Sequence, residues 1–103
     1  MPAEVKICGL STPETVEAAI AAGADFVGLM FFAKSPRNVS LAAARDLAGI
    51  ARGRARIVTV TVDADDALIA AIAAEVKPDL VQCHGTEPPE RLAWIRATHG
   101  LAA

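Results

Sequence analysis

Short apolar runs alternate with alanine-rich amphipathic segments along the whole chain, and this alternation occurs four times. The apolar runs are rich in β-branched residues and predict strands at about Val5–Cys8, Asp25–Phe31, Arg56–Val62 and Leu80–His84. Because helical segments separate these runs, successive strands need crossover connections. The pattern therefore predicts an α/β fold in which right-handed βαβ units build a parallel sheet.

Residues typical of helix ends mark where the four helices begin and stop. Ser11 or Thr12 is expected to be the N-cap of the first helix, and Pro13 lies in its first turn. Glu14 is placed to complete a capping box with Ser11, and Gly23 is expected to end the helix. The other three helices are expected over about Ser40–Arg52, Asp65–Glu75 and Pro88–Thr98, with Gly100 as the last stop.

Two architectures fit four such units: a small open sheet with helices on both faces, or half of an eight-stranded (β/α)8 TIM barrel with helices on one face. Three of the strands alternate polar with apolar residues, and side chains alternate between faces. The residues that we expect on the polar face are Lys6, Cys8, Thr59, Thr61, Asp63, Gln82 and His84. A sheet covered on both faces is usually apolar throughout. The pattern therefore favours the half-barrel, with residues 1–103 as one domain of four βα units.

Composition limits the classes of partner. The 103 residues are 53% hydrophobic and carry a formal net charge of −2, which favours neither nucleic acid nor a membrane as a partner. The amino terminus has no basic segment before an apolar run, and no apolar stretch approaches the ~18 residues of a membrane helix. We therefore expect a cytoplasmic location. Cys8 and Cys83 belong to no Cys-x-x-Cys pair or Cys/His cluster, so neither a metal site nor a disulfide is expected.

Cys8 is the first candidate for chemistry. It ends the first predicted strand, directly before Gly9. Ligands of βα proteins bind beyond the carboxyl ends of the strands, so a thiol at this point would face the substrate. On composition alone, a single cysteine in an apolar strand is more often a small buried hydrophobic residue. Cys83 has the opposite phase from His84 in its strand, and we expect it to pack against the helices.

Three motifs together resemble a known family. They are Lys6-Ile7-Cys8-Gly9, the run Gly28–Phe32 that leads into Ser35-Pro36-Arg37-Asn38-Val39-Ser40, and Val81-Gln82-Cys83-His84-Gly85. In order and spacing they resemble the first half of phosphoribosylanthranilate isomerase, a (β/α)8-barrel enzyme of tryptophan biosynthesis. The chain departs from the family pattern at Asp63 and Cys83, where the family usually has an asparagine and an aliphatic residue. In the family, the general acid is an aspartate on the fifth strand, and loops after the seventh and eighth strands hold the substrate phosphate. Neither feature can be assigned to residues of this sequence.

The resemblance implies an Amadori rearrangement of N-(5-phosphoribosyl)anthranilate, a phosphorylated aminosugar, to an aminoketose, with no cofactor. It assigns to Cys8 the base that removes the C2 proton, and to Arg37 the contact with the anthranilate carboxylate. Both assignments agree with the chemistry of the groups. A guanidinium fork matches a carboxylate, and a thiolate can act as a base when its pKa lies near neutrality.

His84 shares the face of Gln82 and ends its strand at the rim of the expected site, so we expect both residues near the substrate. A hydrogen-bonded interior histidine is at least as compatible with the position of His84. Lys6 is expected on the same face as Cys8. Its ammonium would either favour the Cys8 thiolate or join a polar cluster with Gln82 or Asp63.

Three hypotheses about function follow. The first is an isomerase of which this chain alone is an inactive part, and the second is a half-barrel module that binds anthranilate-like anions without turnover. The third is an unrelated flavodoxin-like domain. The sequence argues against it, because no glycine-rich phosphate loop follows the first strand. For a half-barrel, we expect bare edges at the first and fourth strands and Met30 facing water, which predicts a homodimer through those edges.

Overall fold

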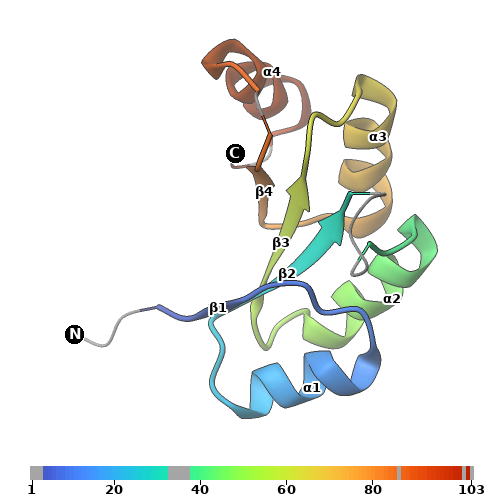
Figure 1. Cartoon of the computed structure of the whole chain (residues 1–103), viewed down its shortest axis with the longest axis vertical. Helices are drawn as coiled ribbons and strands as arrows, with labels where there is room; N and C mark the ends of the chain where they lie inside the picture. The colour runs from blue at the N-terminus through green and yellow to red at the C-terminus, as the bar shows by residue number, and fades with distance from the viewer. Residues whose placement is uncertain (1–3, 33–37, 86, 101, 103) are drawn as a thin grey trace.

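The computed structural model describes residues 4–32, 38–85, 87–100 and 102 (Figure 1). Its parallel sheet has the strand order β1-β2-β3-β4, and a helix follows each strand, which confirms the predicted α/β alternation. The strands are β1 (Lys6–Ile7), β2 (Phe26–Phe31), β3 (Arg56–Thr61) and β4 (Leu80–Cys83). The helices are α1 (Pro13–Ala21), α2 (Leu41–Ala51), α3 (Asp66–Ala71), its π-helical continuation η1 (Ile72–Val76), and α4 (Pro89–His99).

The helix starts follow the predicted caps with one change. Thr12 is the N-cap of α1. Its hydroxyl accepts a hydrogen bond from the Thr15 N–H at 3.2 Å, and the Thr15 hydroxyl accepts one from the Thr12 N–H at 3.2 Å. The capping box therefore pairs Thr12 with Thr15, and the predicted pairing of Ser11 with Glu14 was wrong. Ser40 caps α2 as predicted.

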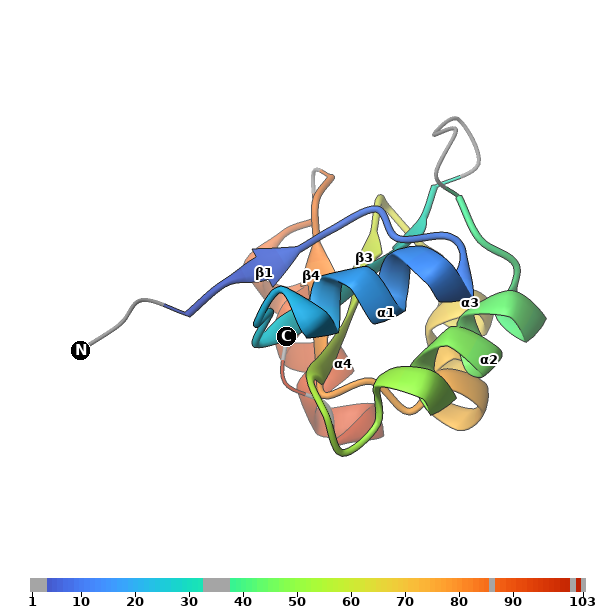
Figure 2. The ribbon, with the colours of Figure 1, turned by 90° about the horizontal axis from the view of Figure 1, so that it is seen from below.

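The helices pack on one side of the sheet (Figures 1 and 2). Val27 and Leu29 of β2 are fully buried in a cluster with apolar residues of α1, α2 and η1. Val81 of β4 is fully buried against Ile69 of α3 and Ile95 of α4. The register places Leu29 and Val81 on the same face, because both align with Thr59 of β3. The opposite face of the sheet is called the inner face below.

The register corrects the predicted orientation of β3. Thr59 aligns with Leu29, which packs in the helix layer, and Thr61 has the same phase. Both threonines are fully buried on that side, whereas the inner face of β3 carries the buried Val58 and Val60. The prediction that Thr59 and Thr61 line a polar inner face was therefore wrong. On this face β1 contributes Lys6 and β4 contributes Gln82, while the exposed Arg56 at the start of β3 has the same phase as Val58.

A side-chain hydrogen bond connects the two outermost strands across the inner face. Lys6 Nζ donates to Gln82 Oε1, although β2 and β3 lie between their strands. In a flat sheet, three strand spacings would separate β1 from β4 by ~14 Å. The direct hydrogen bond therefore indicates that the sheet curves toward its inner face.

Two aspartates fix the amino ends of the strands. Asp25 Oδ2 accepts from the Val5 N–H at 2.8 Å, and Asp79 Oδ2 accepts from the Ile57 N–H at 2.7 Å. Each aspartate directly precedes a strand, and its own backbone N–H donates in return to the carbonyl of the same residue, Val5 or Ile57, at 2.8 Å. Side-chain oxygens thus satisfy backbone donors that would otherwise lack a partner.

Asp79→Ala is expected to destabilise the fold. The substitution leaves the N–H of Ile57, a fully buried residue, without its acceptor. An unsatisfied buried donor costs ~1–3 kcal/mol, and denaturant titration should show a loss of this size in the free energy of unfolding. Asp46→Ala, on the exposed side of α2, is the control and should change that free energy by less than ~0.5 kcal/mol. Equal losses in the two variants would contradict the role of Asp79.

Candidate functional site

Cys8 lies just beyond β1, packed against Gly28 of β2. The parallel pairing of Ile7 with Val27 brings Cys8 beside Gly28. A Cβ added at position 28 would lie 2.8 Å from Cys8 Sγ, so the space that glycine leaves open accommodates the thiol. Cys8 itself is exposed, so its interpretation as a small buried hydrophobic residue was wrong.

The turn that follows Cys8 is anchored to the same glycine. The Gly28 carbonyl accepts hydrogen bonds from the N–H groups of Gly9 at 3.1 Å and Leu10 at 3.3 Å. Gly9 has φ 77°, a left-handed conformation that suits glycine. Backbone hydrogen bonds to β2 therefore hold the chain immediately after the cysteine, at the carboxyl end of the sheet.

Gln82 joins two further polar residues on the inner face. Its Oε1 accepts from Lys6 Nζ, and its Nε2 lies 3.4 Å from His84 Nδ1. An amide nitrogen can only donate, so this contact needs His84 Nδ1 as the acceptor. Of the two predicted roles of Lys6, the structure shows the polar pairing with Gln82. His84 is exposed, and its N–H donates to the Thr61 carbonyl at 2.8 Å, just past the end of β4.

The structure thus brings Gln82 and His84 together and places Cys8 just beyond the carboxyl end of β1 in the same sheet. Across the sheet, Gly28 aligns with Val58 and Val58 aligns with Leu80, so the neighbours of Cys8 in its own row of the inner face are glycine and apolar residues. Arg37, the remaining predicted site residue, lies outside the described residues.

Glu87 is a polar residue at this end of the sheet that the sequence analysis missed. Its Oε2 accepts from the Asp63 N–H at 3.0 Å and its Oε1 from the Gly85 N–H at 2.7 Å, so one carboxylate joins the segments that follow β3 and β4. Asp63 has φ 48°, and a Cβ added at Gly85 would lie 2.7 Å from Asp63 Oδ1. The available sequence signal was an acidic residue directly before Pro88, the N-cap of α4.

The second thiol differs from Cys8 in its surroundings. Cys83 faces the helix layer and packs against the cluster of Ile69, Val81 and Ile95, as predicted. Burial raises the pKa of the Cys83 thiol, and the negative charge of Glu87 raises that pKa further, while the hydrogen bond from Thr61 opposes the shift. A raised pKa leaves less thiolate, which is the reactive form.

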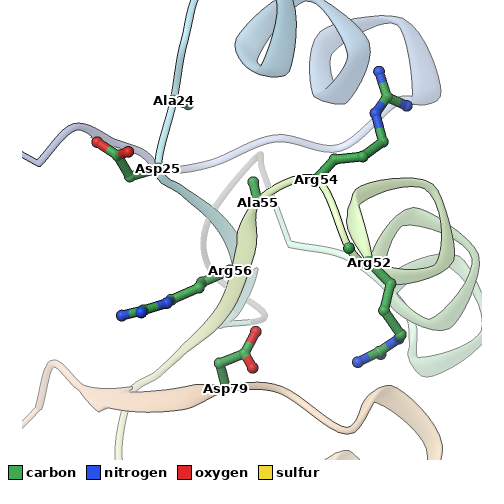
Figure 3. A pocket seen from close by; sticks show the side chains of 8 residues that line it. Ala24, Asp25, Arg52, Arg54, Ala55, Arg56 and Asp79 are labelled. Carbon is green, nitrogen blue, oxygen red and sulfur yellow. The ribbon is translucent and has the colours of Figure 1, made fainter.

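A cavity of about 480 Å³ lies at the opposite, amino end of the strands (Figure 3). Its lining residues are Ala24, Asp25, Arg52, Gly53, Arg54, Ala55, Arg56 and Asp79. Several charged groups in its walls already have structural partners. Arg54 forms an ion pair with Glu17 at 2.8 Å, and Arg52 donates to the Val76 carbonyl at 2.7 Å. Because βα proteins bind substrates at the carboxyl end of the sheet, we do not assign substrate binding to this cavity.

Two further findings concern the described residues. None of the helices there is long and apolar enough to cross a membrane. The same residues include no group of three or more His, Cys, Asp and Glu side chains that could hold a metal ion.

The sequence profile of N-(5'phosphoribosyl)anthranilate (PRA) isomerase matches residues 5–102. The chain belongs to this family. The match removes the hypothesis of an unrelated flavodoxin-like domain. It also agrees with the order of the Cys8, Gln82 and His84 motifs along the sequence.

Relatives named N-(5'-phosphoribosyl)anthranilate isomerase are substantially longer than this chain. The N-(5'-phosphoribosyl)anthranilate isomerase of Afipia carboxidovorans is 64% identical over 95 residues, which cover 92% of this chain and 41% of that protein. The enzyme of Rhodopseudomonas palustris is 59% identical over 101 residues, covering 98% of this chain and 46% of the relative. The chain therefore spans less than half the length of these two relatives.

Solved structures of the family share the fold of this chain. One phosphoribosyl anthranilate isomerase, in complex with reduced 1-(o-carboxyphenylamino)-1-deoxyribulose 5-phosphate, superposes with a TM-score of 0.88 at 33% identity. The match covers 94% of this chain and 50% of that one. The enzyme from Thermotoga maritima gives the same TM-score and identity over 93% of this chain and 47% of its own.

The two cysteines are expected to react at different rates with iodoacetamide. Cys8 is exposed, whereas Cys83 is partly buried and has a raised pKa. Timed alkylation at about pH 8, followed by peptide mass spectrometry, should therefore label Cys8 first. Labelling of Cys83 should continue to accelerate at pH values above the ordinary pKa of a thiol, because burial raises the pKa of this thiol. Equal rates for the two peptides would contradict the surroundings described for Cys83.

Proposed function

We propose that this chain forms the first half of a (β/α)8 barrel that isomerises N-(5'-phosphoribosyl)anthranilate to an aminoketose. The observation that carries the proposal is the exposed Cys8 thiol, held against Gly28 at the carboxyl end of the first strand of a protein of this family. The activity would belong to a longer polypeptide or assembly, since the chain spans less than half the length of the two relatives described above.

Three features of the sheet support the half-barrel. The helices cover one face, and the Lys6–Gln82 hydrogen bond indicates curvature toward the other face. Ala102 also pairs in parallel with Leu80, and the Val81 N–H donates to the Ala102 carbonyl at 2.9 Å. Parallel pairing on the outer edge of β4 is what a following barrel strand would form. Residues 1–103 would then be one domain of four βα units.

Cys8 would act as the base in the proposed reaction. Protonation of the ribose ring oxygen opens the ring to a Schiff base, and removal of the C2 proton gives an enolamine. This enolamine gains a proton at C1 and loses the proton of its C2 hydroxyl, which gives the ketone. The Cys8 thiolate would take the C2 proton, while the acid that protonates the ring oxygen would come from outside this chain. The reaction moves protons within one molecule and requires no cofactor.

The remaining predicted residues would bind the substrate. Gln82 and His84 are in contact on the inner face, where their side chains can donate to or accept from a polar substrate. Lys6 pairs with the uncharged Gln82, so this contact does not neutralise its positive charge, which would attract a phosphorylated anion. We assign to Arg37 the anthranilate carboxylate, because the resemblance places it there and a guanidinium fork suits that group.

Substitution of Cys8 tests the proposed base. The test protein is a fusion of residues 1–103 to the carboxyl-terminal part of the Afipia carboxidovorans relative, which supplies the other half of the barrel. Cys8→Ala and Cys8→Ser are expected to lower kcat by at least ~10²-fold, because proton removal loses its base, with little change in Tm. Cys83→Ala, the matched control, should lower Tm and leave kcat unchanged.

Two outcomes would contradict the proposal. Near-normal kcat in Cys8→Ala would contradict the assignment of the base. A folded fusion that retains Cys8 but lacks turnover of phosphoribosylanthranilate would contradict the proposed activity. It would favour a module that binds anthranilate-like anions without converting them.

The isolated chain is expected to form an inactive homodimer, chiefly through the edge of β1, because Ala102 pairs with Leu80 on the edge of β4 that was expected to be bare. Unpaired backbone groups on the free edge of β1 invite pairing, and the nearby Val5 is 48% exposed. The inner face contributes less to this association than predicted, because Val58 and Val60 are buried and Met30 is half-buried. Light scattering with an activity assay checks the expectation, and a monodisperse monomer with turnover would contradict it.

A further inference from the structure

We propose that Gly28 is a positioning residue for the Cys8 thiol. Because glycine has no side chain, Cys8 Sγ can occupy the space that a Cβ at position 28 would fill. The inference deepens the proposed function and rests on it for the catalytic consequence. The contact between the two residues stands independently of any reaction, because it follows from the packing of β1 against β2.

The requirement for glycine at position 28 is one of space. A Cβ added there would lie 2.8 Å from Cys8 Sγ, 3.1 Å from Cys8 Cα and 3.3 Å from Cys8 Cβ, so its three nearest neighbours are all atoms of Cys8. Gly9, Gly23, Gly53 and Gly100 have positive φ, and Gly28 does not share that conformation. The backbone conformation at position 28 is therefore open to an L-residue, and the closest obstacle to a side chain there is Cys8.

Backbone hydrogen bonds to Gly28 also fix the chain that follows Cys8. Its carbonyl accepts from the N–H groups of Gly9 and Leu10, which follow Cys8 directly. Cys8 Cα therefore cannot withdraw from a new methyl group at position 28 without stretching these hydrogen bonds. The short strand β1 pairs only with β2 in the described sheet. No other strand there prevents β1 and Cys8 from moving away from β2.

An alanine at position 28 should consequently displace the thiol rather than unfold the protein. A general base must lie within hydrogen-bond reach of the proton it removes, and a displacement of ~1 Å can cost ~10²-fold in rate. Substrate binding should change little, because the groups assigned to it are Lys6, Gln82, His84 and Arg37, whereas the three atoms nearest to the added Cβ all belong to Cys8. The expected signature is a loss in kcat with KM preserved.

The experiment uses the fusion protein with Gly28→Ala, and Gly49→Ala as the matched control. Gly49 lies in α2, and a Cβ added there meets nothing within 4 Å. Gly28→Ala should lower kcat ~10- to 100-fold and leave KM within ~2-fold, whereas Gly49→Ala should keep both constants. Unchanged kcat in Gly28→Ala would overturn the catalytic consequence.

A second measurement tests the contact without reference to turnover. Gly28→Ala is compared in the Cys8 and Cys8→Ala backgrounds by thermal unfolding, as a double-mutant cycle. Because Cys8→Ala removes the sulfur that stands 2.8 Å from the new Cβ, the loss in Tm caused by Gly28→Ala should shrink in that background. The rate at which iodoacetamide labels Cys8 should also change in Gly28→Ala and stay constant in Gly49→Ala.

These measurements separate failure of this inference from failure of the proposed function. A fusion without turnover that still shows the thermal coupling and the altered labelling would contradict the isomerase and retain the Gly28–Cys8 contact. If Gly28→Ala does not fold, the double variant with Cys8→Ala decides the matter. Recovery of folding would support steric conflict with the thiol, whereas equal destabilisation in both backgrounds together with unchanged Cys8 labelling would overturn the inference.

Discussion

The packing of the helices against one face of the sheet is the constraint on which the rest of the structure depends. Val27, Leu29 and Val81 are fully buried in the helix layer, so the burial of apolar surface is concentrated on that side. The inner face is thereby free of helices, and Lys6 can reach Gln82 across two intervening strands. Exposed functional groups can exist on this sheet because its stability comes mainly from the other face.

The two ends of the sheet differ in how their polar groups are used. At the amino end, Asp25 and Asp79 accept backbone N–H groups, and Arg54 is paired with Glu17. At the carboxyl end, Cys8 and His84 are exposed. In βα barrels generally, one end supports the fold and the other carries the chemistry, and our proposal gives the second role to the end with Cys8 and His84.

Glycine and an acidic residue shape the carboxyl end. Gly28 leaves room for the Cys8 thiol, and Gly85 leaves room for the Asp63 carboxylate. Glu87 then joins the backbone at Asp63 and Gly85 through its two carboxylate oxygens. Each contact connects segments far apart in the sequence, so the site depends on the sheet register.

The sequence by itself determined the local features: the four βα units, the cap at Ser40, and the place of Cys8 at a strand end, while it left the cap of the first helix open between Ser11 and Thr12. These follow from periodicity and from interactions within a few residues. It could also supply the family motifs around Gln82 and His84. The motif around Arg37 gave a role that stays a prediction, because that residue lies outside the described part of the chain.

Only the tertiary structure decided the orientation and the contacts. Alternation along β3 separates Thr59 from Val58 but does not say which of them faces the helices, since both phases are compatible with a strand. The parallel register with β2 decides it, and buries Thr59 in the helix layer. The same register brings Gly28 beside Cys8, a contact across 20 residues that local propensity cannot encode, because it arises from the way the packed helix directs the chain back to the sheet.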